Sequence, residues 1–194
     1  MKKTFLVVAF FAIFNVSGFS QPFFDLGIKG GANFSKISLD FDDYTSESVV
    51  KTHFGAFARI GWDRIFIQPE IYFSGKGGDL NSSVISNVTK FNFKTVDVPA
   101  LLGVKIIKSK VFGLHAVAGP VFSKITKSDV SNDEIFDAEF YKSHYFGIQY
   151  GLGIDVLFLT FDARMENAIN EFYSQSGKDG KNSTFMLSVG FKFL

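Results

Sequence analysis

Hydrophobic and polar residues alternate along eight segments of this chain. In the last segment every odd position from Phe185 to Phe193 is apolar. An alternation with a period of two places successive side chains on opposite faces of an extended chain, which is typical of a β-strand. The pattern predicts strands at residues 24–34, 53–62, 65–74, 95–106, 112–123, 145–156, 159–166 and 185–193. The expected fold class is therefore all-β.

The links between these segments are short and long in turn. Three are tight, at residues 63–64, 107–110 and 157–158. Four are long, polar and charged, at residues 36–50, 77–92, 127–143 and 171–182. Outer-membrane barrels combine short periplasmic turns with long extracellular loops, and hydrocarbon does not tolerate an open sheet edge. We therefore predict an eight-stranded antiparallel transmembrane β-barrel.

Phenylalanine is unusually frequent, with 26 copies in 194 residues. If the apolar face of each strand meets lipid, aromatic residues gather near both strand ends, as the two interfacial girdles of a barrel require. The predicted girdles are Phe34, Phe54, Phe73, Phe93 and Phe122 above, and Phe24, Trp62, Phe112, Phe158 and Phe193 below. The alternative is a soluble, lipocalin-like barrel with its apolar face inward. We disfavour it because eight strands enclose too little volume for so many phenylalanines.

The opposite face of the strands would line the interior of the barrel, and it carries charge. Buried charges of this kind form either a structural network, in which the groups satisfy one another, or a gated ion path. We favour the structural network, because interior charge is common to such barrels whatever their role. The residues predicted to form this polar interior are Arg59, Glu70, Asp97, Lys105, His115, Asp162, Arg164 and Glu166.

Tight turns fix the register of neighbouring strands, so inward neighbours can be predicted. A glycine repeatedly falls opposite a large inward side chain, which indicates a filled interior rather than an open channel. The predicted pairs are Gly61 with Phe66, Gly55 with Tyr72, Gly153 with Asp162, Gly151 with Arg164, Lys105 with Gly113, and Gly103 with His115. Arg59 is predicted to lie diagonal to Glu70.

The first twenty residues differ from the rest. Two lysines precede an apolar run at residues 5–14, and small residues such as Gly18 and Ser20 follow. This order is that of a secretory signal peptide, and the run is too short to span a bilayer as a helix. We expect residues 1–20 to be a signal peptide and residues 21–194 to form the barrel domain. Without those two lysines, 18 basic residues face 19 acidic ones, a balance that does not suggest nucleic acid as a partner.

No group of residues points to catalysis. His115 is expected to be a packed interior residue. His53 and His144 lie at the predicted outer rim, near Asp137 and Ser143. A histidine with a carboxylate or a serine can serve a hydrolase, so a rim-sited hydrolase is an alternative. We disfavour it, because these residue types are ordinary in loops.

Metal and cofactor sites are not expected either. The chain has no cysteine, and the acidic clusters at residues 40–43 and 129–139 lack the features of an EF-hand loop, so solvated loops are the better interpretation. Residues 75–78 read Gly-Lys-Gly-Gly, but no Gly-Lys-Ser/Thr follows a strand and opens a helix, which excludes a phosphate-binding loop. We interpret this segment as the flexible start of an outer loop.

Several motifs are similar to those of a known family. They are Leu-Gly-Ile-Lys-Gly-Gly-Ala-Asn-Phe-Ser at residues 26–35, Val-Asp-Val-Pro-Ala-Leu-Leu at 96–102, and the shorter sequences at 118–120, 151–153 and 163–164. Over essentially its whole mature length the chain resembles the PorT-like outer-membrane β-barrel domain proteins. The resemblance implies an integral outer-membrane barrel of about eight strands. Some relatives are implicated in protein secretion, and none supplies a catalytic residue that can be matched here. The terminal Leu194 departs from the aromatic that usually ends a barrel-assembly signal.

The function expected from the sequence is that of a non-enzymatic protein of the cell outer membrane, with a structural, adhesive or secretion-accessory role. A narrow porin-like channel is the main alternative. The expected partners are outer-membrane lipid, the barrel-assembly machinery during insertion, and a protein bound by the extracellular loops or the periplasmic rim. No cofactor, metal or catalytic residue is expected.

Overall fold

The computed structural model of the protein describes residues 22–39, 44–82, 88–109, 111–130, 143–170, 173–175 and 178–193. Within these ranges no helix is long and apolar enough to cross a membrane. The strands are β1 (Pro22–Leu39), β2 (Tyr44–Glu47), β3 (Val49–Trp62), β4 (Ile65–Ser82), β5 (Val88–Lys108), β6 (Phe112–Val130), β7 (His144–Val156), β8 (Leu159–Ala168), β9 (Tyr173–Gln175) and β10 (Lys178–Lys192).

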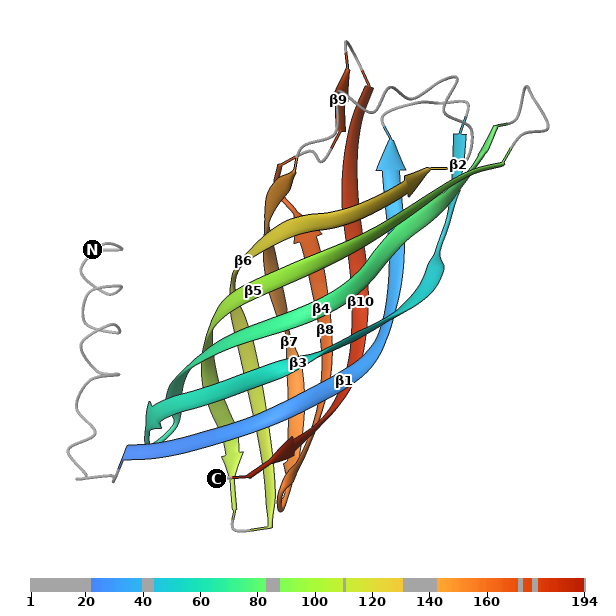
Figure 1. The fold of residues 1–194 in the computed structure, drawn as a ribbon. Helices are drawn as coiled ribbons and strands as arrows, with labels where there is room; N and C mark the ends of the chain where they lie inside the picture. Colours follow the sequence, from blue (N-terminus) through green and yellow to red (C-terminus); the bar gives the residue numbers. More distant parts are fainter. Residues whose placement is uncertain are drawn as a thin grey trace, which may run out of the picture.

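Eight of these strands close into a barrel (Figure 1). Each pairs antiparallel with its neighbour in the order β1, β3, β4, β5, β6, β7, β8 and β10, and β10 pairs with β1. The short strands β2 and β9 are additions at one end, where β2 pairs with β4 and β9 with β10. Closure leaves the wall without an edge strand, as hydrocarbon requires. The prediction of an eight-stranded antiparallel barrel is confirmed.

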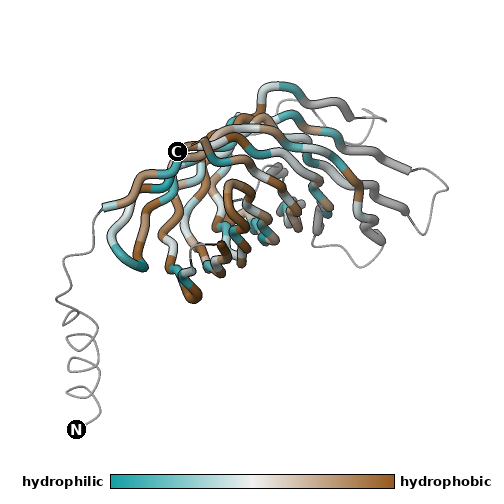
Figure 2. The backbone as a smooth tube through the Cα atoms, turned by 90° about the horizontal axis from the view of Figure 1, so that it is seen from below, coloured by the Kyte–Doolittle hydropathy of each residue, from teal (hydrophilic) through white to brown (hydrophobic). Residues whose placement is uncertain are grey.

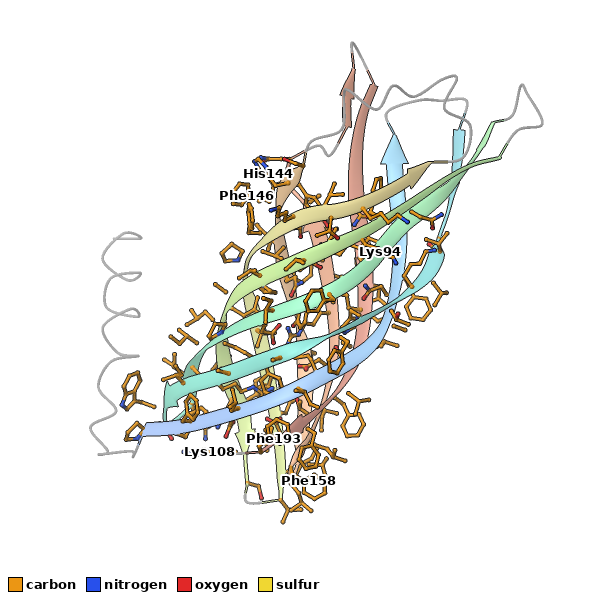
Figure 3. All side chains as sticks on the ribbon, viewed as in Figure 1. Lys94, Lys108, His144, Phe146, Phe158 and Phe193 are labelled. Atoms are coloured by element: carbon orange, nitrogen blue, oxygen red, sulfur yellow. The ribbon has the colours of Figure 1, made fainter. Side chains whose placement is uncertain are left out.

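Tight turns gather at the end of the barrel where β1 begins and β10 ends (Figure 1). Two of them have a non-glycine first residue with positive φ, Asp63 at 50° and Leu157 at 53°. Outer-membrane barrels keep their tight turns on the periplasmic side, so this end is the periplasmic one. In Figure 3, Lys108, Phe158 and Phe193 lie at this end of the molecule.

The register of the strands sets their tilt. Stepping from each residue to its cross-strand partner leads once around the barrel. Such a path that starts at Ser74 of β4 returns to β4 at Arg64, ten residues from its start. The path runs through Ser74, His53, Gly31, Ser188, Asp162, Gly153, His115 and Lys105, whose backbone N–H donates to the carbonyl of Arg64. At ordinary strand spacing, a stagger of ten over eight strands corresponds to a tilt of about 40°. A barrel of this size is just wide enough for its own side chains to fill it.

The two faces of the wall differ in the way that lipid requires. Apolar side chains point outward from every long strand, and the residues between them point inward, so hydrophobic and hydrophilic colours alternate along the tube in Figure 2. Among the outward residues, Phe73, Trp62 and Leu102 are each at least 60% exposed. In the interior, Arg59, Glu70 and Asp97 are buried. This arrangement is the reverse of a soluble, lipocalin-like barrel.

Two details of the sequence-based prediction are wrong, and a third is not confirmed. Phe93, predicted for the upper girdle, is buried in the interior, because it shares a face of β5 with Thr95 and Asp97; the other nine girdle residues are exposed. Residues 75–78 are strand, not the start of a loop. Strands also continue into all four predicted long loops, so the predicted loop lengths are not confirmed. The predicted signal peptide lies outside the described residues.

The register between β5 and β6 also differs from the predicted one. Lys105 pairs with His115, Gly103 with Val117, and Lys108 with Gly113. Beside the turn the offset is already three residues, because β5 continues to Lys108, which pairs with Gly113 in place of Lys105. An irregularity between Lys105 and Ile107 then changes the offset to two residues, and Ile106 and Ile107 are both exposed there. An extra residue in one strand of a pair shifts every pairing on one side of it, and tight-turn counting cannot detect it. The predicted pairs of the other two hairpins are confirmed.

Candidate functional site: the charged interior

The interior of the barrel contains ionisable side chains from all eight long strands. The cations are Lys29, Arg59, Lys76, Arg164 and Lys192, and the carboxylates are Glu70, Asp97, Asp155, Asp162 and Glu166. All except Asp155 and Lys192, which form an ion pair at 3.4 Å, have fully or almost fully buried side chains. A buried charge costs several kcal/mol unless it is paired and hydrogen-bonded, so the contacts of these groups decide what the interior can do.

The central cluster alternates two cations with two carboxylates. Arg164 binds Glu70 at 2.8 Å and Asp162 at 3.2 Å. Lys29 binds the same two carboxylates, at 2.6 and 3.2 Å. Gln68 donates a further hydrogen bond to Glu70, and Tyr72 accepts one from Arg164 at 3.2 Å. Each charge in the cluster therefore has two opposite charges beside it, from strands as far apart as β1, β4 and β8.

A second cluster lies toward the periplasmic end and centres on Arg59. Its guanidinium donates to both carboxylate oxygens of Asp155, at 2.8 and 2.9 Å, and its Nε–H donates to Gln68 at 2.5 Å. Both contacts to Asp155 come from the same nitrogen, Nη1, and they are charge-assisted because both partners are ionised. Gln68 also contacts Glu70, so this cluster is continuous with the central one.

His115 connects the same two clusters. Its Nδ1 lies 3.2 Å from Asp155, and its Nε2 lies 3.1 Å from Asp162. The Nε2 atom is also 3.2 Å from the guanidinium of Arg59. A protonated Nε2 donates to Asp162, whereas a bare one accepts from Arg59, so only one of these two contacts is a hydrogen bond at a time. His115 is thus a packed, connecting residue of the interior.

The third cluster lies toward the extracellular end. Lys76 binds Asp97 at 2.8 Å and makes a short contact with Glu166. Lys76 also donates to the hydroxyl of Tyr145 at 2.9 Å, and Gln149 donates to Glu166 at 2.8 Å. One ammonium thus neutralises two carboxylates with the help of neutral donors.

Seven of the eight predicted interior residues belong to these clusters, and Lys105 does not. Lys105 is half-buried near the periplasmic end, where its ammonium lies 3.2 Å from the centre of the Phe23 ring. Phe23 packs against an apolar cluster formed by Phe66, Leu101 and Val117. The face of an aromatic ring carries partial negative charge, so the Phe23 ring attracts the ammonium of Lys105.

Four residues of the network were not among the predicted ones. Lys29, Asp155 and Lys192 occupy inward positions of the predicted strands, so the alternation alone could have found them. Lys76 falls in the segment interpreted as a loop, and no sequence signal placed it in the interior. Lys29, Lys76 and Asp155 each make two or more ionic contacts, and Lys192 binds Asp155.

The residues of the hydrolase alternative are not assembled in the described part of the chain. His53 is buried in the interior, where its Nδ1 contacts the Asn33 amide oxygen at 2.6 Å, so its predicted place at the open rim is wrong. His144 is exposed and lies 3.3 Å from the Ser143 hydroxyl. Asp137 lies outside the described residues, as does the acidic cluster at 40–43. No group of three or more potential metal ligands occurs among the residues that the structure describes.

Comparison with known proteins agrees with this architecture. Residues 19–174 match a protein family described as "Outer membrane protein beta-barrel domain". The chain belongs to this family. No curated protein matches the sequence. The family and the closed barrel together establish an integral outer-membrane β-barrel protein, with lipid around its apolar face.

A solved structure with a similar fold is that of an outer membrane protein. The outer membrane protein OprG of Pseudomonas aeruginosa has a TM-score of 0.54 and 16% sequence identity, and the alignment covers 87% of this chain and 95% of OprG. The attachment invasion locus protein Ail of Yersinia pestis, solved with a heparin analogue, has a TM-score of 0.46, 17% identity and coverage of 88% and 99%. At these identities the likeness to OprG concerns the fold alone.

Proposed function

We propose that this protein is a non-enzymatic, PorT-like barrel whose charged interior is a structural element rather than a conducting path. Its exposed ends would then serve a structural, adhesive or secretion-accessory role. The observation that supports this proposal is the mutual neutralisation of the interior charges. Arg164, Lys29, Glu70 and Asp162 occupy the middle of the barrel with their charged atoms in contact with one another.

An ion path needs groups that bind an ion weakly enough to release it and a route for the ion through the pore. Here each interior carboxylate of the central cluster already has two cationic partners. A permeating cation would have to displace an ammonium or a guanidinium whose side chain is buried among the other interior groups. A structural role leaves these ion pairs intact, whereas conduction would require some of them to break. The arrangement therefore favours the structural role.

Planar-bilayer recordings of the purified mature protein test the proposal. We expect no large, stable conductance steps, and such steps in the wild-type protein would overturn a purely structural interior. The narrow-channel alternative predicts that Arg59→Ala or Glu70→Ala changes conductance, whereas Arg64→Ala, at an exposed turn, does not. Heat-modifiable migration on a denaturing gel shows that each variant is folded before it is recorded.

The remaining parts of the proposal concern processing and partners. Residues 1–20 are proposed to be a signal peptide, so the mass of the protein recovered from membranes should correspond to a chain that begins at Gln21. Insertion is proposed to use the barrel-assembly machinery. Crosslinking in intact cells, followed by identification of attached proteins, tests for a partner at the extracellular loops or the periplasmic rim.

A rim-sited hydrolase remains the rival class. It requires His144 and Ser143, which are neighbours in the structure, to act on an ester or a peptide. If purified protein hydrolyses such substrates and His144→Ala abolishes the activity while folding is retained, the non-enzymatic proposal is wrong.

A further inference from the structure

The pairing between β3 and β4 is interrupted near the extracellular end of the barrel. Cross-strand partners run in one register up to His53 and Ser74, and they resume where Glu47 of β2 pairs with Asp79 of β4. Residues 48–52 and 75–78 have no partners across this boundary. We call these two segments the wall window. On either side the wall is intact, because β1–β3 and β4–β5 pairs continue past it.

The window opens because β4 leans inward over β1. The amide of Asn33 donates to the carbonyl of Gly75 at 2.9 Å, and the N–H of Gly77 donates to the hydroxyl of Ser35 at 3.2 Å. Backbone groups that would pair with β3 thus bond to side chains of β1. The glycines permit this close approach, and Lys76 between them reaches the interior carboxylates.

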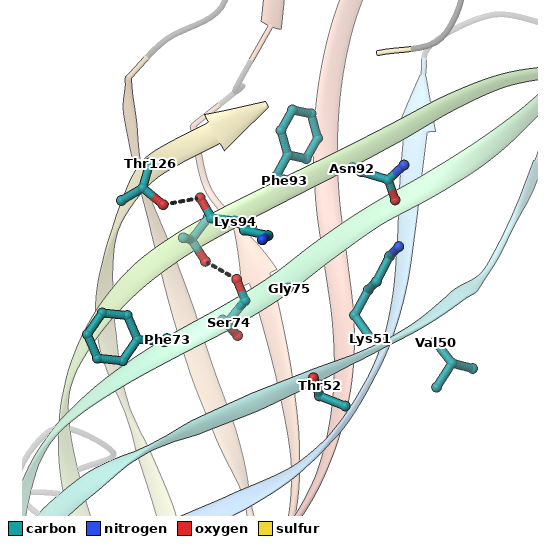
Figure 4. A pocket seen from close by; sticks show the side chains of 11 residues that line it. Val50, Lys51, Thr52, Phe73, Ser74, Gly75, Asn92, Phe93, Lys94 and Thr126 are labelled. Carbon is teal, nitrogen blue, oxygen red and sulfur yellow. Dashed lines mark hydrogen bonds between the residues drawn. The ribbon is translucent and has the colours of Figure 1, made fainter. Parts of the chain in front are cut away.

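A pocket of about 550 Å³ lies at the window (Figure 4). It draws its walls from β3, β4, β5 and β6, and this volume is within the usual range for a small-molecule site. Its lining combines two lysines with uncharged hydrogen-bonding groups and three apolar side chains, those of Val50, Phe73 and Phe93. The lining residues that matter here are Lys51, Lys94, Asn92, Thr52, Val50 and Phe73.

The polar part of the pocket suits an anion. Lys51 and Lys94 form no ion pair with any other residue that the structure describes. In Figure 4 the ammonium end of Lys51 extends toward the amide of Asn92. Lys94 is exposed and lies on the same side of the window as the pocket, so both ammonium groups can reach an anion bound there.

The apolar part of the pocket indicates where it sits in the membrane. Phe73 is 67% exposed and Val50 is 63% exposed, and Phe73 pairs with the exposed Phe54. These residues belong to the upper aromatic girdle, which marks the boundary between hydrocarbon and headgroups. A gap in backbone pairing cannot face hydrocarbon, so the window is placed at headgroup level. The register places Glu47 and Asp79 at its upper edge, beyond the two lysines.

We propose that the wall window binds the phosphate-bearing headgroup of a lipid in the outer leaflet. Lys51 and Lys94 neutralise the phosphate, and the acyl chains of the same lipid lie over Phe73 and Val50. The combination of uncompensated ammonium groups with adjacent exposed apolar side chains favours an amphiphile over a free anion.

Native mass spectrometry of the detergent-solubilised mature protein tests the proposal. The probes are phosphatidic acid, which carries a phosphate monoester, and phosphatidylcholine with the same acyl chains. We expect preferential retention of phosphatidic acid. Lys51→Gln and Lys94→Gln should each weaken its binding about tenfold, because each removes a charge-assisted contact. Lys94→Arg should retain binding.

The matched control is Lys124→Gln, an exposed lysine of β6 outside the pocket lining. If this variant weakens binding as much as Lys51→Gln does, the attraction is diffuse and the site proposal fails. It also fails if the Lys51→Gln/Lys94→Gln double variant, shown to be folded by heat-modifiability, binds phosphatidic acid as the wild type does. Inorganic phosphate that competes at similar concentration would show a free-anion site and overturn the assignment to a lipid.

Discussion

Two boundaries in the same barrel wall behave differently. Between β1 and β10, partners follow one another without a break from Gly27 with Lys192 to Leu39 with Gly180. Between β3 and β4, pairing stops after His53 with Ser74. Both boundaries join antiparallel strands of a closed sheet, so strand propensity does not separate them. The difference arises where β4 exchanges its bonds to β3 for bonds to the inward side chains of β1.

The comparison teaches that the interior and the wall are not independent. Lys76 can neutralise Asp97 and Glu166 only if β4 brings it over the interior. That position separates β4 from β3 and opens the window. The ion pairs of Lys76 therefore form while hydrogen bonds between β3 and β4 are lost. The loss occurs at the height of the lipid headgroups, where water or headgroups can bond to the exposed backbone.

The largest expected effect contrasts a cation of the closed interior with one at the window. Arg164→Ala leaves Glu70 and Asp162 buried with one fewer partner each, and we expect it to lower the free energy of unfolding by about 3–5 kcal/mol. Lys51→Ala removes a cation without an ion-pair partner and should change it by less than about 0.5 kcal/mol. Urea unfolding in lipid vesicles measures both. Equal losses of unfolding free energy in the two variants would show that a cation of the closed interior contributes no more to stability than one at the window.

The second expected effect contrasts a glycine of the filled interior with a glycine of the wall window. A Cβ at Gly103 would overlap the ring of Phe66, whereas a Cβ at Gly75 would overlap no atom and would lie 3.1 Å from the Cβ of Lys51. We expect Gly103→Ala to destabilise by about 1–3 kcal/mol through overpacking. Gly75→Ala should be tolerated within about 1 kcal/mol. The same unfolding experiment distinguishes them, and a neutral Gly103→Ala would contradict a tightly filled interior.

The third expected effect concerns the unpaired backbone itself. Successive amides of a strand point to opposite neighbours, so within residues 48–52 and 75–78 some amides stay paired with β1 or β5, and those that point into the window lack a cross-strand partner, except that of Gly77, which bonds to Ser35. We expect the amides that point into the window to exchange hydrogen at least about tenfold faster than the amides of the β1–β10 boundary, a difference of about 1.4 kcal/mol in opening free energy. Hydrogen-exchange mass spectrometry measures this. Uniform protection around the wall would rule out the window.

The smallest expected effect lies outside the membrane, at the periplasmic turns. A hydrogen bond from Lys108 at 2.9 Å lowers the pKa of the exposed Asp63 carboxyl, and the charge of Lys108 adds to this. Any stability from this pair is therefore present above the ordinary pKa of aspartate and is lost as the pH falls. Lys108→Gln should raise the pKa of Asp63 toward its ordinary value, as measured by NMR titration. An unchanged pKa would show that the contact does not form in solution.

The sequence alone predicted the number of long strands, the closed barrel, the lipid-facing side and most of the interior charges. These features follow from the two-residue alternation and from the requirement that every backbone group in hydrocarbon be paired. The same reasoning could have included Lys29 and Asp155, which lie on the inward face of predicted strands.

Only the tertiary structure decided the partners of those charges, the register between β5 and β6, the inward position of Phe93 and the placement of Lys76. Each depends on contacts between strands far apart in the chain or on a one-residue irregularity, and local alternation carries no information about either. The wall window has the same origin, because a strand leaves its neighbour only where another part of the fold offers its backbone new partners.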